Sequence, residues 1–289
     1  MPVIDTISRQ LLRRTQRLER SQERLRPRIG RELYAQSGAR LQGALIGDTR
    51  WGGGRLLYAM DCRSRQNYGT GYNTAWSDIN MDASNYYAVT PTEALEYRGG
   101  GPYVTMNGTD EGLSIADASW QEAGAEELLV WGWVHPTSIA ADMTMAAKWD
   151  TTGDQRSWQV WWSQASAVFT FQTNVSGLVG ANVTLASTYA TVAIDEWYFV
   201  AAYFEPSTRM QLYVAHNEDE EVTVDELAVG VPASLFNAGT GLTLGTTGTP
   251  DQHWAGKVGV QAGWLNVPSA NLDTYVALLF HETAWAYPS

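Results

Sequence analysis

The sequence is poor in cysteine and histidine and has no long apolar run. Its one cysteine, Cys62, excludes an intrachain disulfide and leaves a buried thiol or a reactive one as alternatives. None of its four histidines has the spacing of a metal-binding motif such as H-E-x-x-H. No apolar stretch approaches the ~18 residues of a membrane span, and no basic stretch followed by an apolar one opens the chain. We therefore expect assembly in a cytosol and no use of general secretion.

Basic residues are scarce outside the N-terminal segment. Residues 1–32 hold nine Arg against four acidic residues, a net charge of +5, whereas the rest holds ten basic against 27 acidic residues, a net charge of −17. Because the body is this acidic, it repels nucleic acid and anionic membranes, and we expect neither as a main partner.

The N-terminal segment carries a heptad pattern over residues 1–29. Ile4, Leu11, Leu18 and Leu25 recur every seven positions and form the first seam position of the heptad. Ile7 adds one apolar residue at the second seam position, the d position, and completes the apolar stripe. Arg and Ser fill the rest of that second seam, which disfavours a two-chain coil. The pattern predicts a helical arm for homotrimer formation or docking; a helix packed on its own body and a nucleic-acid-binding arm stay open.

A glycine-rich segment, 30–54, is predicted to link this arm to a body spanning 55–289. Strand patterns follow at the intervals typical of an all-β sandwich. In 254–264, Val258, Val260, Ala262 and Trp264 alternate with polar or small residues, which predicts one buried face. The polar stretch Arg63–Pro91 is predicted to be a long surface loop, and 272–281 a short closing helix.

The segment Trp197–Val214 predicts a β-hairpin. Two runs of aromatic and β-branched residues, 197–204 and 210–214, flank Pro206-Ser207-Thr208. Proline presets the backbone angle that the second position of a turn requires.

This hairpin resembles the "W-Y-h-V-A-h-h-F-(turn)-h-x-L-Y-V" hairpin (h is apolar) of the concanavalin A-like, laminin-G-like jelly rolls. Four further segments resemble strands of that family in the same order: Ala94–Thr105, Glu127–Pro136, Ala146–Trp162 and Gly256–Trp264. The resemblance covers about residues 55–287 and implies an all-β, two-sheet antiparallel jelly-roll sandwich whose first and last strands pair. It also implies carbohydrate or protein binding as the common use of the fold.

The motifs of enzymes and metal sites are weak. Glycosidases on this fold carry "E-h-D-h-x-E" on one strand, and no E-x-D-x-x-E occurs here. The acidic run Glu218–Glu221 and the pair Asp225-Glu226 are better explained as solvated surface, because adjacent strand residues point to opposite faces. Asn107, Asp110 and Glu111 have the oxygens that calcium prefers, but the same residues often cap a turn.

The aromatic content, with 13 Trp and 14 Tyr, points to carbohydrate, because sugar rings stack on such faces. Mid-strand Trp131, Trp133, Trp158 and Trp162 are predicted to be core. The candidates for sugar contact stand beside Gly, Asp or Asn, with structural packing as the alternative for each: Trp149, Asp150, Trp254, Asp251, Tyr72 and Trp76.

Phage tail fibres, head fibres and decoration proteins commonly combine four features found here. These are a coil-forming arm, a sandwich of the glycan-binding type, and the lack of both a secretion signal and a disulfide. By that analogy we expect a non-enzymatic virion component, docked on other virion proteins through its arm and able to bind cell-surface glycan. A freestanding bacterial carbohydrate-binding module or lectin is the first alternative, and a polysaccharide-cleaving enzyme the second.

Overall fold

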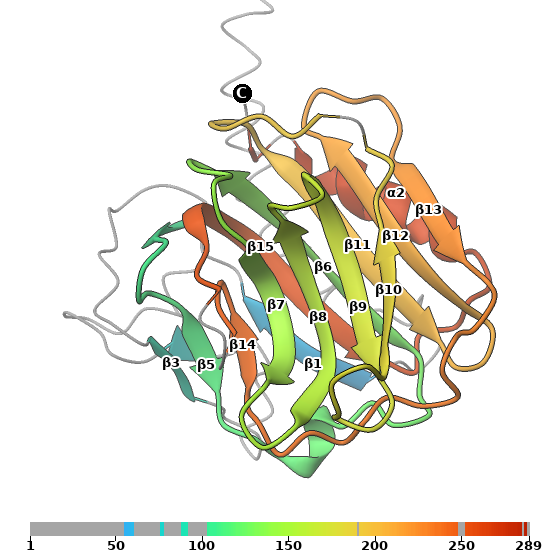
Figure 1. The fold of residues 1–289 in the computed structure, drawn as a ribbon. Coiled ribbons are helices and arrows are strands. Elements are labelled where there is room, and N and C mark those ends of the chain that lie inside the picture. Colours follow the sequence, from blue (N-terminus) through green and yellow to red (C-terminus); the bar gives the residue numbers. More distant parts are fainter. Residues whose placement is uncertain are drawn as a thin grey trace, which may run out of the picture. The chain divides into compact units, whose positions relative to one another are not determined.

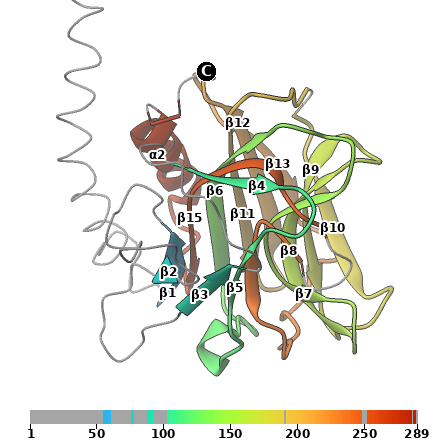
Figure 2. The ribbon, with the colours of Figure 1, turned by 90° about the vertical axis from the view of Figure 1, so that its left-hand side faces the viewer.

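The described residues form two antiparallel β-sheets packed face to face, with one helix on the outside (Figures 1 and 2). The structure is a computed structural model. It describes residues 55–60, 76–77, 88–91, 103–189, 191–247, 252–284 and 286–287, all within one compact unit of the chain. The predicted all-β sandwich is therefore confirmed as two antiparallel sheets. The predicted arm 1–29 and linker 30–54 lie outside the described residues.

The first sheet has seven strands in the order β1-β15-β6-β11-β12-β13, with β4 beside one end of β15. Its strands are β1 (Arg55–Met60), β4 (Val104–Asn107), β6 (Leu128–Pro136), β11 (Tyr198–Glu205), β12 (Arg209–His216), β13 (Thr223–Leu227) and β15 (Ala255–Leu265).

The second sheet has eight strands in the order β10-β9-β8-β7-β14-β5-β3-β2. Its strands are β2 (Trp76–Ser77), β3 (Ala88–Pro91), β5 (Leu113–Ile115), β7 (Met143–Asp150), β8 (Gln155–Ser163), β9 (Val168–Asn174), β10 (Asn182–Ala186) and β14 (Leu242–Leu244). The 3-10 helix η3 (Ser119–Gln121) lies between β5 and β6, and α2 (Leu272–Ala284) follows β15.

Two specific predictions about pairing are confirmed. The first strand of the body pairs with the last, because β1 runs antiparallel to β15. The hairpin forms from β11 and β12, and its turn is closed by the amide of Thr208, which donates to the carbonyl of Glu205 at 3.0 Å. Ser207 takes a φ of 58° there, the positive value that the third position of a type II turn requires.

The core between the two sheets follows from strand alternation. On β8 the side chains of Trp158, Val160 and Trp162 point inward, and on β6 Val130 and Val134 point into the same core from the other sheet. Each large apolar side chain removed from water contributes about 1.5–3 kcal/mol. The four tryptophans predicted to be core are all buried, with at most 2% of the residue exposed.

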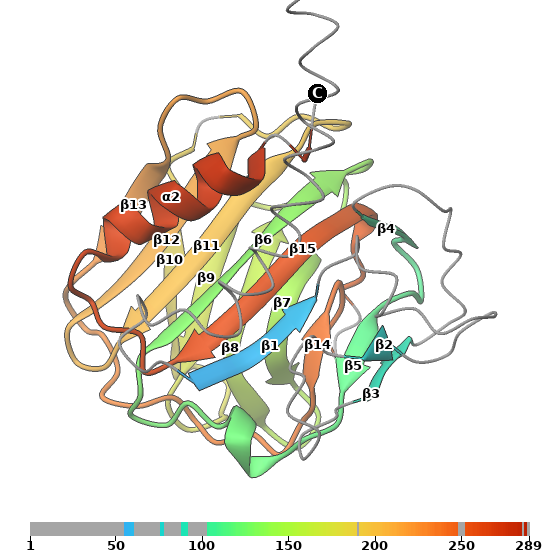
Figure 3. The same cartoon turned by 180° about the vertical axis from the view of Figure 1, so that it is seen from behind.

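The seven-stranded sheet is also buried on its other face, because α2 packs across it (Figure 3). The odd-numbered residues of β6 point to this side. Trp133 stacks on Phe280 and Tyr287, with ring centroids 5.8 and 4.9 Å apart. Its indole N–H donates to the hydroxyl of Thr283 at 2.7 Å. The start of α2 is tied down as well, since the hydroxyl of Tyr213 lies 2.6 Å from a carboxylate oxygen of Asp273.

Two sequence-based predictions need correction. The alternation in 254–264 does not mark one buried face, because a bulge between Val258 and Gln261 shifts the register against β6. Val258 therefore points into the inter-sheet core and Trp264 to the other side, and both are buried. The predicted loop Arg63–Pro91 contains β2 and β3, and β3 pairs with β5.

The Trp133–Thr283 contact gives a test of how α2 is held. Thr283→Val keeps the shape but removes the acceptor of a buried indole N–H, so we expect the free energy of unfolding to fall by about 1–3 kcal/mol. Urea denaturation followed by tryptophan fluorescence measures it. Thr191→Val, at an exposed position, is the matched control and should change little. Equal losses in both variants would contradict this account of the contact.

Candidate functional site

The outer side of the eight-stranded sheet is the candidate binding surface. Figure 1 views the molecule from this side, and no described helix or strand lies in front of β7–β10. Because the inward residues of these strands fix the alternation, the remaining ones point outward. We call them the polar face: Thr144, Ala147, Gln159, Trp161, Thr170, Gln172, Thr184 and Ala186. They carry no charge.

The polar face is aligned by strand register. Thr184 on β10 is paired with Gln172 on β9, and Gln172 with Gln159 on β8. Their side chains form a hydrogen-bonded ladder across the three strands. The Nε2 of Gln159 donates to Oε1 of Gln172 at 2.7 Å, and the Nε2 of Gln172 donates to the hydroxyl oxygen of Thr184 at 3.0 Å. The ladder therefore ends at an exposed hydroxyl group.

Trp161 lies in the next row of the polar face and is half-buried. It is paired with Thr170 on one side and Thr144 on the other, both small enough to leave the indole standing above them. Its indole N–H and the Oε1 of Gln159 are both shielded from solvent and have no hydrogen-bond partner. Both atoms lie on the outer side of β8, two residues apart.

Of the residues that the sequence singled out for sugar contact, the structure describes the side chains of Trp149, Asp150 and Trp254. Trp149 and Trp254 are buried, with 4% and 0% of each residue exposed, so neither presents a ring face to solvent. Asp150 is half-buried and accepts a hydrogen bond from the backbone N–H of Thr152 at 2.7 Å. Asp251 and Tyr72 lie outside the described residues. Trp76 lies in β2, but its side chain is not among those described.

Trp161 was missed because the sequence was read for polar neighbours of tryptophan. The informative signal was the face of the strand to which each residue points, as given by the alternation along β8. Once Trp158, Val160 and Trp162 are assigned to the core, Trp161 is the aromatic residue of β8 left on the opposite face. Strict alternation over this strand makes that assignment possible from sequence alone.

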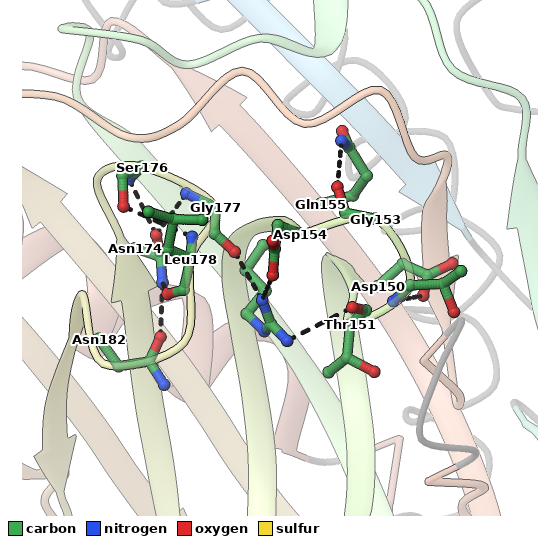
Figure 4. A network of polar contacts seen from close by, with 12 residues as sticks. Asp150, Thr151, Gly153, Asp154, Gln155, Asn174, Ser176, Gly177, Leu178 and Asn182 are labelled. Carbon is green, nitrogen blue, oxygen red and sulfur yellow. Dashed lines mark hydrogen bonds and ion pairs between the residues drawn. The ribbon is translucent and has the colours of Figure 1, made fainter.

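At one end of these strands, the buried guanidinium of Arg156 joins two loops, whose residues Asp154 and Gly177 are labelled in Figure 4. It pairs with Asp154 at 2.7 Å in the β7–β8 turn and donates to the carbonyl of Gly177 at 2.7 Å in the β9–β10 loop. Asn174 shapes the second loop, since its Oδ1 accepts from the backbone N–H groups of Ser176 and Gly177.

This arrangement holds three exposed apolar side chains on the β9–β10 loop. Val175, Leu178 and Val179 have 44%, 53% and 78% of the residue exposed. The loop's backbone is thereby fixed before any partner arrives, which reduces the entropy that ordering a loop would cost.

One group of titratable side chains lies where β5, η3 and β7 meet. The ammonium group of Lys148 is buried and lies 2.6 Å from Asp117 and 3.3 Å from Glu122. It also donates to the carbonyl of Thr240 at 2.7 Å. Burial raises the pKa of the Glu122 carboxyl, and the nearby Lys148 opposes that rise. Lys148 is thus engaged by three acceptors, while the Oε2 of Glu122 is shielded from solvent and has no hydrogen-bond partner.

The residues considered for calcium cap a turn. The Oδ1 of Asn107 accepts the backbone N–H of Thr109 at 2.8 Å, and its Nδ2 donates to Asp110 at 2.7 Å. The carboxylate of Glu111 accepts the backbone N–H of Asn107. In the described part of the chain, no three His, Cys, Asp or Glu side chains gather to hold a metal ion.

The chain is similar to the receptor-binding domains of clostridial toxins in fold. No family model matches the sequence, and none of the curated proteins does. The binding domain of Paraclostridial Mosquitocidal Protein 1 aligns with a TM-score of 0.56 at 9% identity, over 81% of this chain and 55% of that one. The botulinum neurotoxin serotype G binding domain aligns with a TM-score of 0.57 at 10% identity, over 81% and 54%.

A structure of botulinum neurotoxin type C, which depends on two ganglioside molecules to enter cells, aligns with a TM-score of 0.52 at 9% identity, over 78% and 51%. This chain thus spans about half the length of these neighbours. At such low identity the likeness concerns the fold alone, and that fold is one that binding domains use. The expected phage family is not among these findings. Within the described residues, no helix has the length and apolarity needed to cross a bilayer.

The clamp at Arg156 is testable. Arg156→Met leaves buried carbonyl groups without a donor, so we expect a loss of about 1–3 kcal/mol in the free energy of unfolding. Hydrogen exchange should also quicken in residues 151–155 and 175–181. The control is Arg209→Met, which removes a guanidinium that is more exposed than that of Arg156 (24% against 6% of the side chain) and should cost at most about 1 kcal/mol. Unchanged exchange in both loops would count against the clamp.

Proposed function

We propose that this protein is a non-catalytic structural component of a phage-like particle, displaying the sandwich as a polysaccharide-binding domain. The N-terminal arm would oligomerise and dock it, and the polar face would bind the ligand. The observation that carries the binding role is the uncharged face around Trp161, where an aromatic ring and a hydrogen-bonded amide ladder lie side by side.

Three features support a binding role over catalysis. The polar face has no carboxylate, and cleavage of a glycosidic bond ordinarily uses a pair of them. The two acids beside Lys148, Asp117 and Glu122, are engaged in ion pairs. The solved structures of similar fold are binding domains. The virion assignment rests on the sequence, through the heptad arm and the charge segregation between arm and body.

Binding without cleavage is the first test. We expect the full-length protein to sediment with insoluble bacterial or plant polysaccharides and to release no reducing ends during prolonged incubation, because the polar face lacks the carboxylates needed for hydrolysis. A reducing-sugar assay on the same samples measures release. Steady release that disappears on mutating an acidic pair would support the enzyme alternative.

Oligomerisation through the arm is the second test. Light scattering coupled to size-exclusion chromatography should give a trimer for the full chain and a monomer after deletion of residues 1–32, because the heptad stripe supplies the association. A full-length variant with Leu11 and Leu18 changed to Ser, measured at the same molar concentration, should be a monomer like the deletion. A full-length monomer at micromolar concentration would contradict the proposal.

A further inference from the structure

We propose that the polar face recognises an uncharged polysaccharide, which stacks on Trp161 and receives a hydrogen bond from Thr184. This inference rests on the proposed function and names its ligand class and contacts. Both groups belong to one face, on strands two places apart and in neighbouring rows two residues apart, so their Cα atoms lie about 12 Å from each other at ordinary strand spacing and rise. A ligand that reaches both must extend across the strands.

The direction of the amide ladder determines what Thr184 can offer. One amide N–H of each glutamine donates to the next acceptor, beginning at Gln159 and ending on the Thr184 oxygen. Because that oxygen already accepts, the hydroxyl hydrogen of Thr184 is left to donate outward. Chains of hydrogen bonds polarise one another, which strengthens the terminal donor. The exposed end of the ladder therefore suits a sugar hydroxyl or ring oxygen as acceptor.

Trp161 supplies the apolar contact. A sugar ring presents C–H groups on one side, and the face of an indole is the electron-rich partner for them. The indole is held between Thr144 and Thr170, and the Thr144 hydroxyl is itself fixed by a hydrogen bond to Gln252 at 3.1 Å. The unpaired Oε1 of Gln159 and indole N–H of Trp161 give hydroxyl groups of a ligand further partners after a small side-chain rotation.

Charge excludes the acidic alternatives. The polar face has no Lys or Arg with which to pair a carboxylate or sulfate, and the chain beyond residue 32 carries a net charge of −17. An anionic polysaccharide would be repelled at long range and find no cation at contact. A neutral polysaccharide is not repelled and needs no cation at the contact.

The experiment measures binding of the full-length protein to immobilised polysaccharides by biolayer interferometry. Neutral probes are dextran, galactomannan and β-1,3-glucan; anionic probes are alginate, hyaluronan and polysialic acid. We expect at least one neutral probe to bind and the anionic probes to bind at least tenfold more weakly. Trp161→Ala should weaken neutral binding about tenfold or more, and Trp161→Phe, which keeps a ring, should weaken it less.

Thr184→Val removes only the hydroxyl group and should weaken binding severalfold, whereas Thr191→Val, on an exposed position outside the polar face, should not. Because Thr184 is exposed, this variant is expected to fold even if Trp161→Ala does not. Binding that both polar-face variants leave unchanged, or a preference for anionic probes, would overturn this inference while leaving polysaccharide binding intact. No binding to any probe would overturn the proposed function as well.

Discussion

The seven-stranded sheet carries apolar side chains on both faces, and the rest of the fold depends on a cover for each face. On β6, Val130 and Val134 face the other sheet, while Trp131 and Trp133 face away from it. Apolar side chains on both sides of a sheet must be removed from water on both sides. The eight-stranded sheet covers one face, and α2 with its neighbouring chain covers part of the other. The helix is therefore a structural layer, although it comes last in the described chain.

In the described part of the chain, this arrangement leaves the outer side of β7–β10 without a covering helix or strand. Its strands alternate apolar and polar residues as antiparallel strands with one wet face do. Burial there is nevertheless high, because Gln159 and Thr170 are covered by their neighbours on the face, with 4% and 3% of each residue exposed. The exposed groups are few, and each is held by a hydrogen bond or by packing. A surface that is fixed before binding loses little entropy when a ligand arrives.

Much of this fold could be predicted from residue pattern, and the failures have physical causes. Alternation and turn chemistry placed the strands from β4 to β15 and the hairpin turn at Pro206. The bulge in β15 was not predictable, because it depends on pairing with β6 and leaves no mark in local composition. The short strands β2 and β3 exist only through their partners, since two to four residues carry too little pattern. The burial of Trp149 and Trp254 has a related cause: a polar neighbour in sequence says little about exposure, which depends on the face of the strand to which a residue points.

The fold likeness to toxin binding domains does not carry their ligands with it, because affinity resides in side chains that differ at about nine positions in ten. Gangliosides bear acidic sugars, which an uncharged face on an acidic body is poorly suited to hold. A face with one aromatic platform and one outward donor would bind a single chain weakly. Display of several copies on one arm would make each later contact intramolecular, and avidity could then exceed the single-site affinity a hundredfold or more. The acidic bodies also repel one another, which favours separated sites on an extended polysaccharide. In the proposed oligomer, weak sites and mutual repulsion would both favour attachment to an extended polysaccharide over attachment to a short glycan.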